Sequence, residues 1–201
     1  MLTLDVIGEK KRLRAHFLAL RNALSDEERH ALDAALCHEI AAHPAFARCD
    51  VLLCFSAVKG EPDFSALYQL ARKRGVKTAF PRCMGTQMSF HVIENDEELE
   101  AGRFGIPTPR KDAPLATLSP RTLCLLPALA ATKDGARLGY GGGFYDRFLS
   151  DFPGTALLPL YDFLLSETLP EEPTDVRIPH ILTQKGVIRC DAGISSTTPP
   201  L

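Results

Sequence analysis

Apolar and polar side chains alternate with the period of an α-helix at the start of the chain. Within residues 4–24, apolar side chains recur at helical spacing at Leu13, Phe17, Leu20 and Leu24. This pattern predicts one amphipathic helix. The same phase places basic side chains on or near its solvent-facing side, namely Lys10, Lys11, Arg14 and Arg21.

A second helix is predicted directly after the first. Ser25 is followed three residues later by Glu28, a capping-box pattern in which each residue satisfies a backbone N–H of the other. Acidic residues between them favour the positive end of the helix dipole. Pro44 limits the other end, so we expect the helix to run from Ser25 to about Ala42.

Apolar runs too short for helices follow along the chain. They occupy residues 51–55, 76–80, 88–93, 123–126 and 156–160 and are bounded by Pro, Gly or charged residues. A helical pattern separates the first two runs, beginning near Pro62 and ending before Gly75. Strands that alternate with helices form mainly parallel sheets with helices on both faces, so the sequence predicts a three-layer αβα fold.

Two stretches of the chain are predicted to lack regular structure. Residues 105–120 contain four prolines and are expected to form an irregular crossing. Residues 193–201 are rich in Ser, Thr and Pro and are expected to be a flexible tail. We therefore expect one α/β domain over residues 1–192.

Composition and charge narrow the class of protein. Of 201 residues, 45% are apolar and 24% charged, which is typical of globular proteins. Lys and Arg number 23 against 25 Asp and Glu, a net charge of -2 that favours neither nucleic acid nor a membrane surface as partner. No apolar stretch approaches the roughly 18 residues of a membrane span. We expect a small-molecule substrate and a monomer or weak dimer.

The cysteines give no sign of a metal site. They are Cys37, Cys49, Cys54, Cys83, Cys124 and Cys190, and none forms a C-x-x-C pair. Their apolar neighbours indicate buried thiols. We therefore expect the protein to be cytoplasmic, where thiols stay reduced.

The most unusual stretch runs from Lys133 to Arg147 and is rich in glycine. It follows the predicted strand at 123–126 and leads into a helical pattern around Phe148. Glycines before a helix let backbone amides converge on one point, usually a phosphate. A glycine cluster is also compatible with tight turns and no ligand. The spacing fits neither GxGxxG, whose third glycine is replaced by Phe144, nor a P-loop.

This stretch resembles the signature of the 5-formyltetrahydrofolate cyclo-ligase family, also called methenyltetrahydrofolate synthetase. The family's R-L-G-x-G-x-G-Y-Y-D string is matched by Arg137, Leu138, Gly139, Gly141, Gly143, Tyr145 and Asp146. Phe144 replaces the first Tyr. Other family motifs occur in order along nearly the whole chain: K-x-x-L-R at residues 10–14, S-x-E-E-R at 25–29 and G-x-x-G-I at 102–106.

Two further motifs are only partly kept. In an E-x-x-T turn, Glu61 is present but Phe64 replaces Thr; in an H-D-x-x-V-D motif, Asp175 is present but Pro179 replaces the second Asp. These departures leave open a non-catalytic folate- or nucleotide-binding protein on the same scaffold. The family's fold is similar to those of sugar-phosphate isomerases and CoA-transferases, so an enzyme of that kind is a third possibility. The sequence offers no dedicated acid/base pair for it.

The resemblance implies conversion of 5-formyltetrahydrofolate to 5,10-methenyltetrahydrofolate, with ATP and Mg²⁺ required and ADP and phosphate released. It assigns Lys10 and Arg14 to the ATP phosphates. It assigns Asp146 and Asp175 to Mg²⁺. Nucleotide and substrate contacts extend over Arg137, Leu138, Gly139, Tyr140, Gly141, Gly142, Gly143, Phe144 and Tyr145.

On the folate side, the resemblance assigns Ser56 and Glu61 to the pterin. It makes Arg137 and Tyr145 the candidate catalytic residues, with Tyr145 between the two ligands. A purely structural alternative exists for these roles: a solvated helix face for the basic residues, and charges that complement helix N-termini for Asp146 and Glu61.

Overall fold

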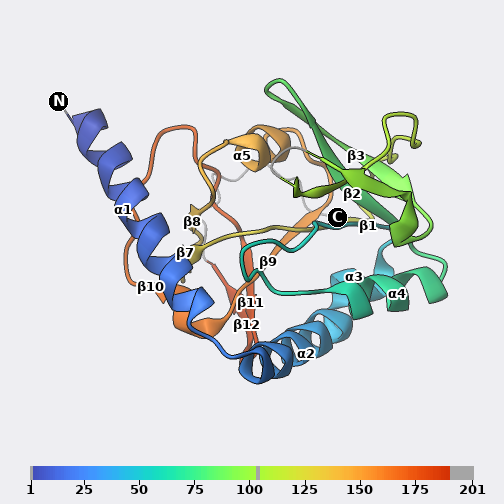
Figure 1. Cartoon of the computed structure of the whole chain (residues 1–201), viewed down its shortest axis with the longest axis horizontal. Helices are drawn as coiled ribbons and strands as arrows, with labels where there is room; N and C mark the ends of the chain where they lie inside the picture. Colours follow the sequence, from blue (N-terminus) through green and yellow to red (C-terminus); the bar gives the residue numbers. More distant parts are fainter. Residues whose placement is uncertain (1, 103–104, 191–201) are drawn as a thin grey trace, which may run out of the picture.

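The computed structural model describes residues 2–102 and 105–190 (Figure 1). Its helices are α1 (Leu2–Asn22), α2 (Asp26–Ala42), α3 (Pro44–Arg48), α4 (Ser65–Lys73) and α5 (Phe144–Leu149), with 3-10 turns η1 (Asp96–Glu98) and η3 (Asp162–Leu164). Its strands are β1 (Val51–Leu53), β2 (Lys77–Met84), β3 (Gln87–Ile93), β4 (Leu99–Ala101), β5 (Pro107–Pro109), β6 (Thr122–Leu125), β7 (Ala130–Thr132), β8 (Arg137–Leu138), β9 (Thr155–Pro159), β10 (Leu165–Ser166), β11 (His180–Thr183) and β12 (Gly186–Arg189).

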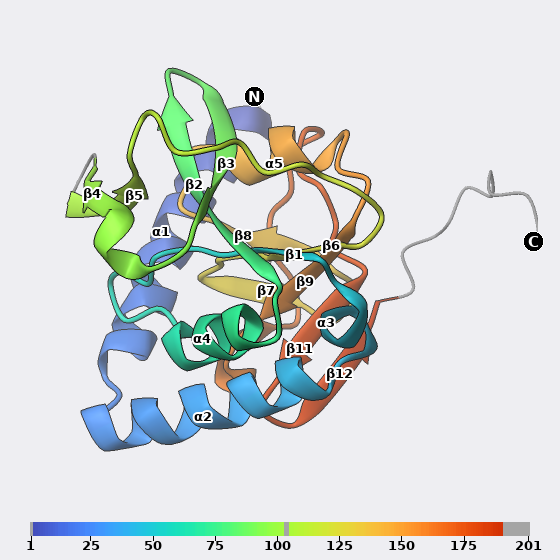
Figure 2. The same cartoon turned by 90° about the vertical axis from the view of Figure 1, so that its right-hand side faces the viewer.

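A sheet that has seven strands within the described residues forms the centre of the molecule. Its order is β12-β11-β9-β6-β1-β2-β3. The strands from β11 to β2 are parallel, and the edge strands β12 and β3 are antiparallel to their neighbours. Helices α2, α3 and α4 lie on one side of it and α5 on the other (Figures 1 and 2). The predicted three-layer αβα fold with a mainly parallel sheet is confirmed.

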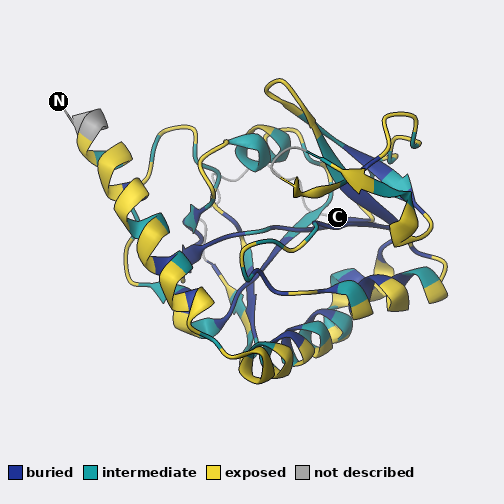
Figure 3. Ribbon diagram, in the orientation of Figure 1, coloured by how far each residue is buried: buried dark blue, intermediate teal, exposed yellow. Residues whose placement is uncertain are grey.

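The core follows the central strands. Leu52, Leu123, Leu157 and Ile181 come from four adjacent parallel strands, and each is at most 1% exposed. Figure 3 shows these strands as a buried band between partly exposed helices. Continuous apolar runs are typical of parallel strands covered on both faces, which is why the sequence located all of the central ones except β11.

The start of α2 agrees with the sequence pattern. The backbone N–H of Glu28 donates to Ser25 Oγ at 3.2 Å, and the Ser25 N–H donates to Glu28 Oε2 at 2.9 Å. The predicted capping box is therefore confirmed. Helix α4 begins later than expected, at Ser65 rather than Pro62, because the Asp63 carboxylate accepts from the Ser65 N–H at 2.8 Å.

Helix α1 is present, but the predicted solvent-facing side was wrong for Lys10 and Arg21, which are buried, and right for Lys11, which is exposed. Lys10 is 4% exposed and Arg21 is 0% exposed, whereas Leu20 is 39% exposed. The residues that face the protein follow the stripe Lys10, Arg14, Phe17 and Arg21, spaced i, i+4, i+7 and i+11. A helix stripe is fixed by its packing partners, and here polar loops meet the cations while the apolar core takes Phe17.

Several short elements were not predicted. These are α3, the small sheet of β10, β7 and β8, the pair β11 and β12, and the pair β4 and β5. The prediction that residues 105–120 hold no element was wrong, because β5 lies within them. The sequence analysis singled out no apolar run at these strands of two to four residues, as it did for the equally short β1 and β6, and their partners decide whether they form.

The cysteines partly match expectation. Cys49, Cys54, Cys124 and Cys190 are buried, but Cys37 is half-buried and Cys83 is exposed. Burial raises the pKa of the Cys54 and Cys124 thiols, so both stay protonated. Within the described ranges, no helix combines the length and hydrophobicity needed to cross a bilayer. The predicted tail, residues 193–201, lies outside the described residues, and the one-domain assignment for 1–192 stays a prediction.

Candidate active site

Two loops leave the carboxyl edge of the central sheet side by side in strand order. After β1, residues 56–61 carry Ser56 and Glu61, and we call them the Glu61 loop. After β6, the chain forms the β7–β8 hairpin and then residues 139–143, which we call the glycine loop. The hairpin is a correction, because the sequence suggested that the glycine loop followed β6 directly. Open parallel sheets bind ligands at this edge.

The glycine loop needs glycine at two positions. Gly141 has φ +93° and Gly143 has φ +62°, both in the left-handed region that glycine adopts at little cost. Gly143 is also the residue from which α5 starts. Within the described residues, the backbone N–H groups of 140–143 donate to no protein acceptor. The loop therefore presents amides that are available for an anion.

Helix α1 places a guanidinium against this loop. Arg14 Nε donates to the carbonyl oxygen of Gly139 at 2.9 Å. A Cβ added at Gly141 would lie 3.2 Å from the Arg14 guanidinium. Arg14 and Gly139, 125 positions apart in the sequence, thus meet in the fold. The positive charge of Arg14 therefore lies beside the available amides.

Lys10, one helical turn earlier, lies between two acids. Its Nζ is 2.6 Å from Asp175 Oδ2 and 2.8 Å from Glu172 Oε2. Burial acts to lower the Lys10 pKa, but the hydrogen bonds and charges of Asp175 and Glu172 outweigh it, so the pKa lies above 10.5. Lys10 is therefore a permanent cation at neutral pH, bridging α1 to the loop that carries Asp175.

Asp146, in the first turn of α5, lies close to the same region. Its Oδ1 accepts from Arg137 Nη2 at 2.8 Å and from the Val176 N–H at 3.3 Å. Val176 directly follows Asp175 in the chain. Asp146 therefore contacts the backbone next to Asp175, the other predicted metal ligand. Each carboxylate already faces one cation, Arg137 or Lys10. Arg137 Nε is buried and has no hydrogen-bond partner.

Glu61 is buried in its loop, with 5% of its surface exposed. Oε2 accepts from the Val58 N–H at 3.0 Å, while Oε1 is buried without a hydrogen-bond partner. Burial raises the Glu61 pKa; the Val58 N–H, the Tyr140 hydroxyl and the Arg21 guanidinium oppose this. An unsatisfied buried oxygen is costly in a folded protein, and a donor that reached Oε1 would remove that cost.

The other predicted side chains of the site are aromatic or small. Tyr145 packs edge-on against Phe90, with the Arg137 Cζ 5.8 Å from its ring centre. Phe144 is covered by the Arg147 guanidinium, 5.2 Å from its ring centre. Ser56 differs from expectation in one respect: its Oγ donates to the Pro107 carbonyl at 2.8 Å, so β5 forms its present contact.

Sequence reasoning missed Arg21 and Glu172 as neighbours of the site. Arg21 was expected near solvent, but Arg21 Nη2 contacts the hydroxyl of Tyr140 in the glycine loop. A usable signal existed for Arg21, because it continues the Lys10–Arg14–Phe17 spacing. None existed for Glu172, whose role depends on a contact 162 residues away along the chain.

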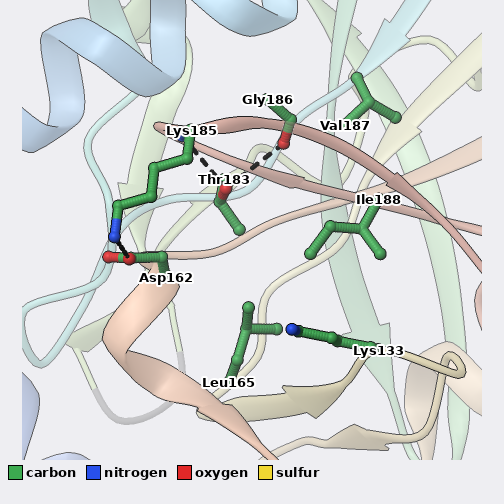
Figure 4. Close-up of a pocket in the computed structure, with 8 residues that line it drawn as sticks. All are labelled: Lys133, Asp162, Leu165, Thr183, Lys185, Gly186, Val187 and Ile188. Atoms are coloured by element: carbon green, nitrogen blue, oxygen red, sulfur yellow. Dashed lines mark hydrogen bonds and ion pairs between the residues drawn. The ribbon is translucent and has the colours of Figure 1, made fainter.

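A separate shallow depression lies away from these loops (Figure 4). It is lined by Lys133, Asp162, Leu165, Thr183, Lys185, Gly186, Val187 and Ile188. Figure 4 shows the Lys185 ammonium turned to Asp162 and the Thr183 hydroxyl turned to the Gly186 carbonyl. None of the predicted site residues lines it, and its Lys185 and Asp162 side chains are paired with each other.

Comparison with known proteins decides the family. Residues 6–184 match the model of the 5-formyltetrahydrofolate cyclo-ligase family. The chain belongs to this family. Its members are ligases, so the chain is an enzyme of that class. The family resemblance drawn from the glycine loop and the N-terminal motifs is confirmed.

Relatives of this cyclo-ligase family member align with different shares of its length. The 5-formyltetrahydrofolate cyclo-ligase of Escherichia coli K12 is 26% identical over 83% of this chain and 96% of its own. That of Mycolicibacterium smegmatis is 41% identical, over 43% of this chain and 46% of its own. The solved 5,10-methenyltetrahydrofolate synthetase of Aquifex aeolicus superposes with a TM-score of 0.78 at 29% identity, covering 94% of this chain and 96% of that one.

A preformed metal cage is not part of this site. Within residues 2–102 and 105–190, no group of three or more His, Cys, Asp or Glu could hold a metal ion. Mg²⁺ is commonly held by one or two carboxylates, with substrate phosphates and water completing its shell. Asp146, which accepts from the Val176 N–H, and Asp175, the residue before Val176, fit that arrangement.

A valine at Gly141 is expected to weaken nucleotide binding by about 10-fold or more, because left-handed backbone costs a β-branched residue roughly 1–2 kcal/mol and its Cβ would press on Arg14. The dissociation constant of an ATP analogue checks this. Gly75→Val is the matched control: Gly75 has φ +77° with nothing within 4 Å of an added Cβ. Equal effects of both variants on nucleotide affinity would contradict the assignment.

Proposed function

We propose that the protein converts 5-formyltetrahydrofolate to 5,10-methenyltetrahydrofolate with ATP and Mg²⁺. The observation that carries this proposal is that α1 places Arg14 against the glycine loop and Lys10 against Asp175, while Asp146 accepts from the N–H of Val176, the residue after Asp175. Available amides and fixed cations suit a triphosphate, and carboxylates suit its cation.

The reaction requires activation of the formyl group. The formyl oxygen attacks the γ-phosphorus of ATP and ADP leaves, which turns a poor leaving group into phosphate. N10 of the folate then attacks the activated carbon, loses its proton, and the carbon–oxygen bond breaks to release phosphate. Phosphoryl transfer of this kind depends mainly on positioning and on neutralised charge, which the site residues offer.

Asp146 and Asp175 are the residues that would hold Mg²⁺, which would supply charge neutralisation at the phosphates when bound. Arg14 and the glycine loop would orient the phosphates. Lys10 would donate to them in exchange for one of its present acids. Arg137 would stabilise the negative charge that develops during transfer, and its buried, unpartnered Nε supports a ligand contact there.

Tyr145 and the Glu61 loop would form the folate side. Glu61 Oε1, buried without a partner, is suited to accept from N–H donors of the pterin ring. Ser56 would assist from the start of the same loop. Tyr145 would line the boundary between the two ligands, since its half-buried ring lies against the Arg137 guanidinium.

The direct test measures formation of the methenyl product. Purified protein is incubated with 5-formyltetrahydrofolate, ATP and Mg²⁺, and the methenyl absorbance band and ADP are followed together. We expect both to appear in equal amounts and to require all three components. Ligand binding without ADP would instead support a non-catalytic binder, and turnover without ATP would support an enzyme of the isomerase or transferase kind.

Replacing Glu61 by Gln is expected to raise the KM for the folate about 10-fold or more, since a charged acceptor is replaced by a neutral one. The KM for ATP should change little. Because burial raises the Glu61 pKa above 4.5, folate affinity of the unmodified enzyme should fall as the pH drops through that raised pKa. In Glu61→Gln this acidic limb should disappear; its persistence would contradict the role.

We also propose that the enzyme acts in the cytoplasm as a monomer or weak dimer, with small molecules and neither nucleic acid nor membrane as partners. Buried, protonated thiols at Cys54 and Cys124 and the net charge of -2 support this. Sedimentation of the purified protein checks the oligomeric state.

A further inference from the structure

Arg21 is a fully buried cation with only neutral hydrogen-bond partners among the described residues. Its Nε and Nη2 donate to the Lys59 carbonyl at 3.2 and 2.9 Å, and Nη1 donates to the Ala128 carbonyl at 3.2 Å. Nη2 also donates to the Tyr140 hydroxyl at 2.5 Å. Burying a guanidinium costs its hydration, and only a complete set of acceptors offsets that cost.

The acceptors belong to three different segments. Lys59 lies in the Glu61 loop, Ala128 follows β6, and Tyr140 lies in the glycine loop. The forked guanidinium can reach all three at once, which the single ammonium of a lysine cannot do with the same geometry. Arg21 therefore joins the loop proposed for the folate to the loop proposed for the nucleotide.

The Glu61 loop requires such support. Lys59 has φ +50° and Gly60 has φ +73°, so two successive residues are left-handed, which costs a non-glycine residue free energy. Arg29 of α2 donates from Nη1 to the Gly60 carbonyl at 2.9 Å. Two arginines thus hold consecutive carbonyls, but Arg29 has no bond to the glycine loop. Arg29 offers a natural control.

We propose that Arg21 is a positioning residue that couples the two loops, so that binding of either substrate favours binding of the other. The proposal rests on the proposed function. Because one guanidinium fixes both loops, a ligand that orders one loop also lowers the ordering cost of the other, and the second ligand then binds more tightly. The coupling passes through the Arg21–Tyr140 contact.

The test measures the affinity of a non-hydrolysable ATP analogue with Mg²⁺, by calorimetry, with and without saturating 5-formyltetrahydrofolate. In the unmodified enzyme we expect the folate to tighten nucleotide binding at least about 5-fold. Tyr140→Phe removes the hydroxyl that accepts from Arg21 and that also opposes the raised pKa of Glu61, and Arg21→Gln removes the fork. In both variants the ratio of nucleotide affinity with folate to that without folate should fall close to 1. The double variant should show no lower ratio.

Arg29→Gln is the matched control, and it is expected to weaken folate binding while keeping the ratio. A ratio that survives in Tyr140→Phe and Arg21→Gln, or that Arg29→Gln abolishes equally, would overturn the proposal, as would a ratio of 1 in the unmodified enzyme. Thermal unfolding identifies a variant that fails to fold; if Arg21→Gln does, Tyr140→Phe decides. Failure of the proposed function would be recognised separately, because the unmodified enzyme would then form no methenyl product.

Discussion

Replacing Asp146 by Asn is expected to lower ATP-dependent turnover by about 100-fold or more, the size of effect seen when one charge-stabilising group is lost from a transition state. The amide keeps an oxygen that can accept from Arg137 and Val176, so the fold should lose only about 1 kcal/mol of unfolding free energy. The charge that would attract Mg²⁺ is what disappears. Turnover and urea unfolding, measured on the same preparation, separate the two effects.

The Mg²⁺ dependence gives the sharper readout for Asp146. The variant should need a higher Mg²⁺ concentration for half-maximal turnover than the unmodified enzyme. Asp50→Asn is the matched control, because Asp50 forms a similar ion pair with Arg121 at 2.7 Å but is largely exposed and far from the site in the sheet. It should change neither quantity appreciably. A loss of stability as large as the loss of activity would mark Asp146 as structural.

Replacing Lys10 by Met is expected to reduce nucleotide affinity by about 10-fold to 100-fold, because a charge-assisted contact to phosphate is worth roughly 1.5–3 kcal/mol. Methionine keeps most of the apolar stem but leaves Asp175 and Glu172 without their shared cation. These acids are 22% and 34% exposed. Solvent screening therefore limits the loss of unfolding free energy to about 1–3 kcal/mol.

The pH dependence of that loss tests the ion pairs themselves. Since the folded-state pKa of Lys10 is raised above 10.5, its stabilising contribution is fully present below that pH and is lost as the pH rises through the raised value. The difference in unfolding free energy between the unmodified protein and Lys10→Met should thus stay constant from pH 7 to 9. Arg12→Met, on the exposed side of α1, should alter neither affinity nor stability.

Two of the three departures from the family motifs are absorbed by the fold. Phe64 replaces a polar Thr, but its ring is 1% exposed and packs edge-on against Phe55 and Tyr68. Pro179 is the last residue before β11, and its carbonyl accepts from the Cys190 N–H at 3.0 Å. These replacements therefore give no structural reason to expect loss of catalysis.

The sequence by itself determined most of the central strands, the start of α2 and the place of the glycine loop. These features rest on local causes: apolar runs that demand burial, a Ser25–Glu28 cap that closes within one turn, and glycines that permit left-handed backbone. It also located the family string of the glycine loop, because that string lies in one stretch of chain.

Only the tertiary structure decided how α1 faces the protein and what its cations contact. Lys10 meets Asp175 across 165 positions of sequence, and Arg21 meets Tyr140 across 119. A charged side chain is predicted to face water unless a partner offsets its desolvation, and the partner is supplied by topology rather than by neighbours in the chain. For that reason the local pattern assigned these cations to solvent, while the fold buried them at the site.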